Sequence, residues 1–186
     1  MNNRYLVSRE RFIAASPQEI FEVLATPALH SVIDGSETVK EAQPRGPERL
    51  QLGSKFGMEM NMKMDYKILN TVSEFEEGRR IGWHHFYGHV WRYLLVATTD
   101  DAGTPGTLVT EQWDARQVRG KFFLRLAGYL RRHPASIEKT LAKLDWHLTG
   151  TGTGAGPGTD PDPGTEAGPG TVVGPGTEAG PGTVAG

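Results

Sequence analysis

The chain has 186 residues, no cysteine, 20 Lys and Arg, 22 Asp and Glu, and a formal net charge of -2. The lack of cysteine excludes disulfides, a thiol nucleophile and a thiolate zinc site. No apolar run approaches the roughly 18 residues that span a bilayer, and residues 1–10 lack a signal-peptide core, so we expect a cytoplasmic protein with no integral membrane association.

Glycine and proline divide the chain into two parts. Residues 149–186 hold 13 of the 24 glycines and repeat hexapeptides such as GPGTEA. A segment of this composition has almost nothing to bury and cannot offset the entropy lost on ordering. We therefore expect one domain over residues 1–148 and a disordered Gly/Pro/Thr-rich tail over residues 149–186, with a docking or tethering arm as the alternative for the tail.

The first predicted elements are a strand over residues 4–14 and a helix that begins at Ser16. Ser16 and Glu19 match the S-x-x-E capping box, and Pro17 suits the first helical position. Pro27 is expected to end this helix, and residues 28–34 predict a second short helix before Gly35.

Six further strands are predicted by period-two patterns between turn signals, over residues 38–42, 54–62, 66–75, 80–87, 91–98 and 107–115. Their short links favour hairpins and hence an antiparallel meander. After Gly120 the apolar residues recur every three or four positions, which indicates a long C-terminal helix. We expect Pro134 to kink or divide that helix.

This order of elements predicts an α+β fold. We expect a curved seven-stranded antiparallel sheet wrapped around the long C-terminal helix, with two short helices after the first strand. A wide sheet curls because its strands twist. A curled sheet closed by one helix is expected to leave an internal cavity, the form of site that binds small apolar molecules.

The candidate ligand-binding residues are apolar and share strand faces or the helix stripe. One predicted strand alternates an aromatic residue with methionines, which either form an adaptable ligand wall or fill an ordinary core. Aromatic residues alternate in the same way on three later strands. The full set is Phe56, Met58, Met60, Met62, Trp83, Trp91, Tyr93, Trp113, Phe122 and Leu126.

Glu111 and His85 are the candidate catalytic residues. A carboxyl group on a cavity-facing strand has a raised pKa and acts as a general acid or base. The alternative is that Glu111 pairs with Arg92 across strands or faces water. His84 and His85 are adjacent on a strand and point to opposite faces, so we expect no metal site.

No cofactor or nucleic-acid partner is predicted, because the chain lacks the phosphate-binding glycine motifs and any nucleic-acid-binding motif. The basic stretch over residues 116–143 is interpreted as the solvated face of the terminal helix. The pattern predicts no particular oligomeric state.

Eight short segments between residues 4 and 148 match a known family. They are ASPQEIF at 15–21, IDGS at 33–36, LGSKFGM at 52–58, NTV at 70–72, FE at 75–76, RIGW at 80–83, WRY at 91–93 and GTLVTE at 106–111. On these segments the sequence resembles the START-like, helix-grip superfamily, specifically the polyketide cyclase/dehydrase and lipid-transport group known as SRPBCC, and the resemblance covers residues 4–148. Members of this superfamily bind lipids, sterols, hormones or polyketides, and only some are enzymes.

Three functions follow as hypotheses. The first is binding of a small hydrophobic, lipid-like or polycyclic, ligand in a cavity between the sheet and the C-terminal helix. The second is a polyketide cyclase or dehydratase-like enzyme in the same cavity, with Glu111 or His85 moving protons and Tyr93 or Arg92 assisting. The third is a partner-regulating module that uses the tail as a tether.

Overall fold

A computed structural model describes residues 5–36, 39–42, 46–61, 65–84, 88–118 and 129–150. Residues 151–186 lie outside this part of the chain, so the division into a domain and a tail stays a prediction. The described elements are β1 Leu6–Ile13, α1 Pro17–Ala25, η2 Pro27–Leu29, α2 His30–Ile33, β2 Val39–Ala42, β3 Lys55–Asn61, β4 Asp65–Glu76, β5 Arg80–His84, β6 Val90–Thr99, β7 Pro105–Asp114 and α4 Tyr129–Thr149.

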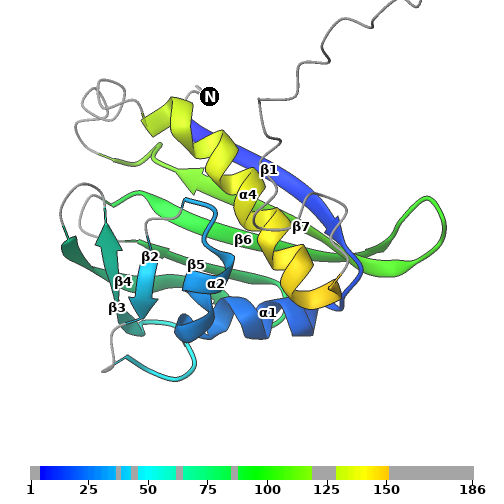
Figure 1. The fold of residues 1–186 in the computed structure, drawn as a ribbon, viewed down its shortest axis with the longest axis horizontal. Helices are drawn as coiled ribbons and strands as arrows, with labels where there is room; N and C mark the ends of the chain where they lie inside the picture. Colours follow the sequence, from blue (N-terminus) through cyan, green and yellow to red (C-terminus); the bar gives the residue numbers. More distant parts are fainter. Residues whose placement is uncertain are drawn as a thin grey trace, which may run out of the picture.

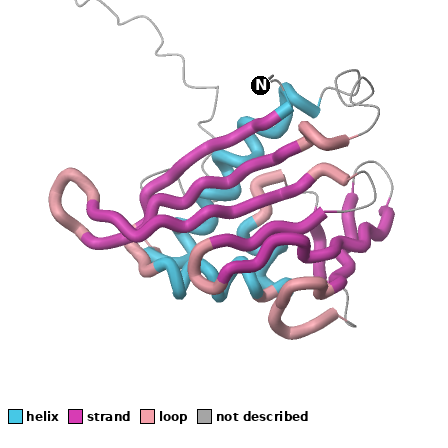
Figure 2. Tube along the Cα trace, turned by 180° about the vertical axis from the view of Figure 1, so that it is seen from behind, coloured by secondary structure: helices cyan, strands magenta, loops and turns pink. Residues whose placement is uncertain are grey.

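The strands form one antiparallel sheet in the order β1-β7-β6-β5-β4-β3-β2. Consecutive strands from β2 to β7 pair as neighbours, and the last strand, β7, also pairs with the first strand, β1. The helices lie on one side of this sheet (Figures 1 and 2). The expected α+β class, with an antiparallel sheet and a C-terminal helix, is confirmed.

The capping box at the start of α1 is confirmed. The Ser16 hydroxyl accepts a hydrogen bond from the Glu19 backbone N–H at 3.3 Å, and the Glu19 carboxylate accepts from the Ser16 backbone N–H at 2.8 Å. Two backbone donors that a helix start leaves unpaired are thereby satisfied. The cap directs Ile20, Phe21 and Leu24 toward the sheet, where all three are fully buried.

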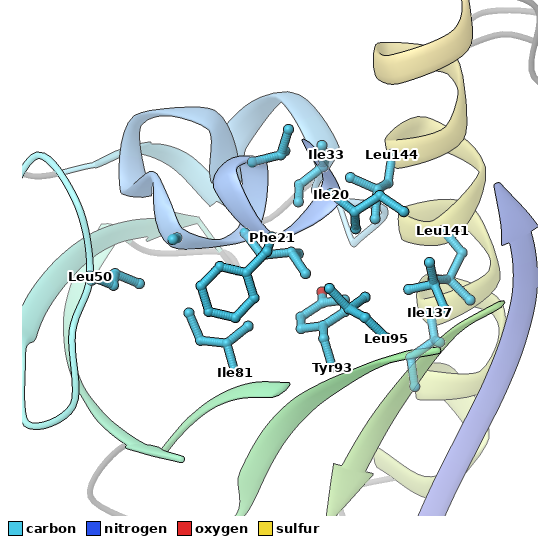
Figure 3. Packing of buried hydrophobic residues seen from close by; sticks show 14 of the residues in the cluster. Ile20, Phe21, Ile33, Leu50, Ile81, Tyr93, Leu95, Ile137, Leu141 and Leu144 are labelled. Carbon is cyan, nitrogen blue, oxygen red and sulfur yellow. The ribbon is translucent and has the colours of Figure 1, made fainter. Parts of the chain in front are cut away.

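The core lies between the helices and the inner face of the sheet. In α4, Ile137, Leu141 and Leu144 recur at helical spacing and are buried (Figure 3). They pack in one cluster with residues of α1 and α2 and with Tyr93 and Leu95 of β6. One apolar stripe of α4 therefore covers the sheet, as the period of the sequence predicts.

Two ion pairs join α4 to β1. The Arg9 Nε atom lies 2.6 Å from Glu138 Oε1, and the Arg11 Nε atom lies 2.8 Å from Asp145 Oδ2. Arg9 and Glu138 are well exposed, so their pair contributes little to stability. Asp145 is buried beneath Arg11, and this second pair fixes how α4 lies on β1.

Helix α4 runs without interruption through Pro134. Of the two outcomes expected at Pro134, a kink or a division of the terminal helix, the division is not observed. The proline lies near the beginning of α4, where it removes the one backbone bond to the carbonyl of Leu130. The buried stripe of the later turns outweighs that loss, because tertiary packing supplies most of a helix's stability.

Gly35 lets the end of α2 lie directly against α4. A Cβ atom at this position would collide with the backbone of Ser136 and Thr140. The Gly35 backbone N–H donates to Thr140 Oγ1 at 3.0 Å, and Lys143 Nζ donates to the Asp34 carbonyl at 2.7 Å. A residue without a side chain is required here because backbone meets backbone.

We predict that Gly35→Ala lowers the free energy of unfolding by about 2 kcal/mol or more, because the added methyl group must push α2 away from α4. Urea unfolding followed by circular dichroism measures the change. Ala102→Ser is the control, because Ala102 is exposed in the turn between β6 and β7 and its substitution should leave the free energy of unfolding nearly unchanged. Equal stability of Gly35→Ala and the wild type would contradict the close approach.

Candidate functional site

Three tryptophans lie in register on the inner face of the sheet. Trp83 of β5 pairs with Trp91 of β6, and Trp91 pairs with Trp113 of β7. Directly paired residues share one face of a sheet, so the three indoles form a row. Trp113 is fully buried, whereas Trp83 and Trp91 are partly exposed. This placement agrees with the alternation of aromatic residues in the sequence.

Residues from α2 and β3 extend the aromatic row. The ring of His30 stacks on Trp83 with centroids 5.1 Å apart and planes 19° apart, and Phe56 meets Trp83 edge-on at 5.6 Å. Burial lowers the pKa of His30, so its imidazole is neutral at neutral pH. The Nε2 atom lies 2.8 Å from the Leu24 carbonyl, which the Nε2–H tautomer satisfies.

Helix α4 adds an imidazole to the other end of the row. The His133 ring lies 4.6 Å from the Trp113 ring and 5.2 Å from the Trp91 ring, centroid to centroid. Burial lowers the pKa of His133 to about 4, so this side chain is also neutral at neutral pH. His89 approaches Trp113 as well, at 5.4 Å. These contacts make the environment of Trp113 aromatic.

Glu111 and Tyr93 occupy the next row of the same face. They are register partners on β7 and β6, with exposed fractions of 2% and 5%. Burial raises the pKa of Glu111 well above its usual range, the nearby Asp34 charge raises it further, and a hydrogen bond with Tyr93 opposes both effects. Burial and Glu111 also raise the pKa of the Tyr93 hydroxyl. The pair therefore favours its protonated, uncharged form.

Arg92 lies on the opposite face of the sheet from Glu111. Its Nε atom donates to Glu74 Oε2 at 2.6 Å, and its Nη1 atom donates to Gln112 Oε1 at 3.0 Å. Adjacent strand residues point to opposite faces, and Arg92 pairs in register with Gln112. The alternative in which Glu111 pairs with Arg92 or faces water is therefore wrong, and so is the idea that Arg92 assists inside the fold.

Two buried polar atoms on the inner face of β7 have no hydrogen-bond partner among the described residues. They are Glu111 Oε2 and Trp113 Nε1. Leaving such an atom unpaired costs about 1–3 kcal/mol. Residues two apart on a strand point to the same side, so both atoms belong to one surface. A polar group of a bound molecule, or a water molecule, would satisfy them.

The remaining sequence candidates are only partly described. Phe56 is buried beside Trp83. Met58 and Met60 belong to β3, but their side chains fall outside the description, as do residues Met62, His85, Phe122 and Leu126 altogether. The methionine wall and the roles of these residues stay predictions.

Sequence reasoning missed His30 and His133 as neighbours of the tryptophan row. His30 is a single histidine in a four-residue helix, and His133 precedes a proline in a basic stretch. Neither context carries a pattern that indicates proximity to a particular strand. Within the described segments, no three His, Asp or Glu side chains gather as metal ligands do, and no helix is long and apolar enough to cross a membrane.

Comparison with known sequences finds two uncharacterized relatives in Mycobacterium tuberculosis. Uncharacterized protein Rv0088 of strain H37Rv is 33% identical over 143 residues, and the corresponding protein of strain CDC 1551 is 32% identical over 143 residues. Each match covers 74% of this chain and 62% of the relative, so the chain spans less than two thirds of either relative. No family model matches the chain.

Solved structures with the same arrangement are distant in sequence. A START superfamily protein from Mycobacterium smegmatis has a TM-score of 0.54 at 16% identity, over 77% of this chain and 96% of that one. Protein SSP2350 from Staphylococcus saprophyticus has a TM-score of 0.55 at 13% identity, over 81% and 96%. The Aha1 dimer from Colwellia psychrerythraea has a TM-score of 0.52 at 15% identity, over 80% and 98%.

These likenesses concern the fold, because the identities are too low to carry over residues or activities. The chain has the START-like helix-grip fold.

Proposed function

We propose that this protein binds a small hydrophobic molecule, lipid-like or polycyclic, between the inner face of the sheet and α4. The observation that supports this function best is the row of Trp83, Trp91 and Trp113 beside the uncharged Glu111–Tyr93 pair. Ligand sites for apolar molecules have this composition, with many apolar and aromatic side chains and few polar groups that set orientation.

The partial exposure of Trp83 and Trp91 supports binding at this end of the row. An indole offers a wide flat face, and covering apolar surface contributes about 25 cal/mol per Å². His30 and Phe56 hold Trp83 from two sides, so its ring is already positioned. A preformed aromatic surface loses little entropy when a ligand settles on it.

We predict that Trp83→Leu weakens binding of Nile red, a neutral apolar dye, by about tenfold, which corresponds to about 1.4 kcal/mol of lost contact. Trp146→Leu is the matched control, since Trp146 lies on an exposed part of α4 with 43% of its surface accessible. Fluorescence titration of the dye measures both variants. Equal affinities of the two variants, or no dye binding by the wild type, would speak against the proposed function.

A second candidate function is general acid catalysis by Glu111 in a polyketide cyclase or dehydratase-like reaction. It is favoured by the surroundings of Glu111: burial raises the pKa of this carboxyl group well above its usual range, and Tyr93 hydrogen-bonds to it. A protonated carboxylic acid held in an apolar interior donates a proton to a carbonyl or departing hydroxyl oxygen. His85 remains the other proposed proton carrier.

For this second function, Glu111→Gln is expected to abolish turnover of a poly-β-ketone substrate while apolar binding persists, because the amide retains the shape but transfers no proton. His85→Asn tests the other carrier in the same assay. Product formation followed by mass spectrometry and dye binding followed by fluorescence separate the two effects. Unchanged turnover in both variants would remove the proposed carriers.

The proton on Glu111 also predicts a pH dependence of stability. Because the folded pKa lies above the unfolded value of about 4.5, the folded state retains a proton that the unfolded chain loses, and stability falls as pH rises above that value. The Glu111→Gln variant has no carboxyl group at this position, so its stability does not fall with pH for this reason. Its stability relative to the wild type should therefore increase with pH above 4.5, by up to about 1.4 kcal/mol per pH unit.

Urea unfolding at a series of pH values measures this difference. Glu48→Gln, which changes an exposed carboxyl group, is the control and should give a curve parallel to the wild type. Parallel curves for Glu111→Gln and the wild type would show that Glu111 does not hold a proton in the fold.

A further inference from the structure

Two polar atoms on the inner face of β7 can both donate a hydrogen bond to the same acceptor. Trp113 Nε1 is a donor and has no acceptor capacity. Glu111 Oε2 becomes a second donor when it carries the carboxyl proton. Both atoms are buried, and neither has a hydrogen-bond partner among the described residues. Two donors without an acceptor fit a ligand that brings an acceptor oxygen.

The charges around Glu111 disfavour an anionic ligand. Arg9 is its register partner on β1, but the Arg9 guanidinium lies on Glu138 of α4, with Nε 2.6 Å from Oε1. Among the residues that the structure describes, no cation contributes to the pKa of Glu111, and Asp34 adds negative charge at the end of α2. Tyr93 on β6 is uncharged. A ligand carboxylate would lose its hydration here and would gain no counter-ion from the described side chains.

A cationic ligand meets a different obstacle. An ammonium group carries only donors, so it leaves the Trp113 indole N–H unpaired. It would also require Glu111 to lose its proton inside a buried site, where the charged form is disfavoured. His133 of α4 lies next to Trp113 and is neutral, so it supplies no charge in either direction.

We propose that the ligand is an uncharged molecule whose polar end is an acceptor oxygen, such as a ketone or ester carbonyl, held between the Glu111 carboxyl group and the Trp113 N–H. This inference rests on the proposed ligand-binding function and narrows it to a chemical class. Glu111 and Trp113 orient the oxygen, and the tryptophan row contacts the apolar body. Carboxylic acids and amines of the same apolar size are rejected.

The test compares three probes with the same chain length: methyl decyl ketone, dodecanoic acid and dodecylamine. Each competes with Nile red for the full-length protein at neutral pH. The ketone is expected to bind at least about tenfold more tightly than the acid or the amine, because burying an unpaired charge costs more than burying a hydrogen-bonded carbonyl. Affinity of the acid or amine equal to that of the ketone would overturn the inference and leave apolar binding intact.

Variants assign the effect to the two donors. Glu111→Leu should weaken ketone binding by about 3- to 10-fold, the range of one neutral hydrogen bond, whereas Glu111→Gln keeps an N–H donor and should remain within about threefold of the wild type. Trp113→Phe keeps a ring, removes the other donor and provides an independent test if Glu111→Leu fails to fold. Glu48→Gln is the unchanged control.

Two further outcomes are decisive. If the variants at Glu111 and Trp113 all bind the ketone as tightly as the wild type, the oxygen is not held by these donors and the inference is wrong. If the wild type binds neither Nile red nor any of the three probes, the proposed ligand-binding function fails, and the inference fails with it.

Discussion

The structure depends on covering one face of an antiparallel sheet with the apolar stripe of α4. Ile137, Leu141 and Leu144 supply that stripe, and apolar burial of this kind stabilises a fold by about 25 cal/mol per Å². The ion pair between Arg9 and Glu138 is exposed and adds little to the stability of the fold, so its main effect is on the orientation of α4 relative to β1. Removing α4 would expose the inner face beneath it to water.

The same burial produces the chemistry of the interior. Glu111, Tyr93 and His30 are all polar, and loss of hydration drives each toward its uncharged form. Uncharged polar groups among aromatic rings suit recognition of an apolar molecule with one polar end. On β7, the unpaired polar atoms lower the free energy of unfolding of the ligand-free protein. A ligand that pairs with these atoms stabilises the folded state.

The two faces of the sheet separate two kinds of polar interaction. On the outer face, Arg92 pairs with Glu74 and Gln112, so charge is balanced locally. On the inner face, burial raises the pKa of Glu111 well above its usual range and favours the protonated carboxyl group. Neighbouring residues of one strand lie in these two different environments, because successive side chains point to opposite faces of the sheet.

The fold is shared with proteins of very low sequence identity, and this limits what the fold alone implies. The START superfamily protein from Mycobacterium smegmatis matches most of the chain at 16% identity. A fold persists at such distances because it depends on the pattern of apolar residues, whereas ligand choice depends on individual side chains. The proposed function accordingly depends on Glu111, Trp83 and Trp113 rather than on the fold.

The sequence by itself determined the local features. The capping box at Ser16, the end of α1 before Pro27 and the hairpin strands follow from interactions between residues close along the chain. Period-two alternation also predicted that Trp91 and Tyr93 share one face of their strand, and the register of the sheet places them opposite Trp113 and Glu111. These expectations succeeded because strand parity is a local property.

Only the tertiary structure decided which of those faces is buried and what lies against it. It placed Glu111 inside and Arg92 outside, stacked His30 on Trp83 and set His133 against Trp113. It also showed that α4 continues through Pro134, which decides against a division of the helix there. These outcomes depend on packing between segments far apart in the chain, and the free energy of that packing is not encoded in any single stretch of sequence.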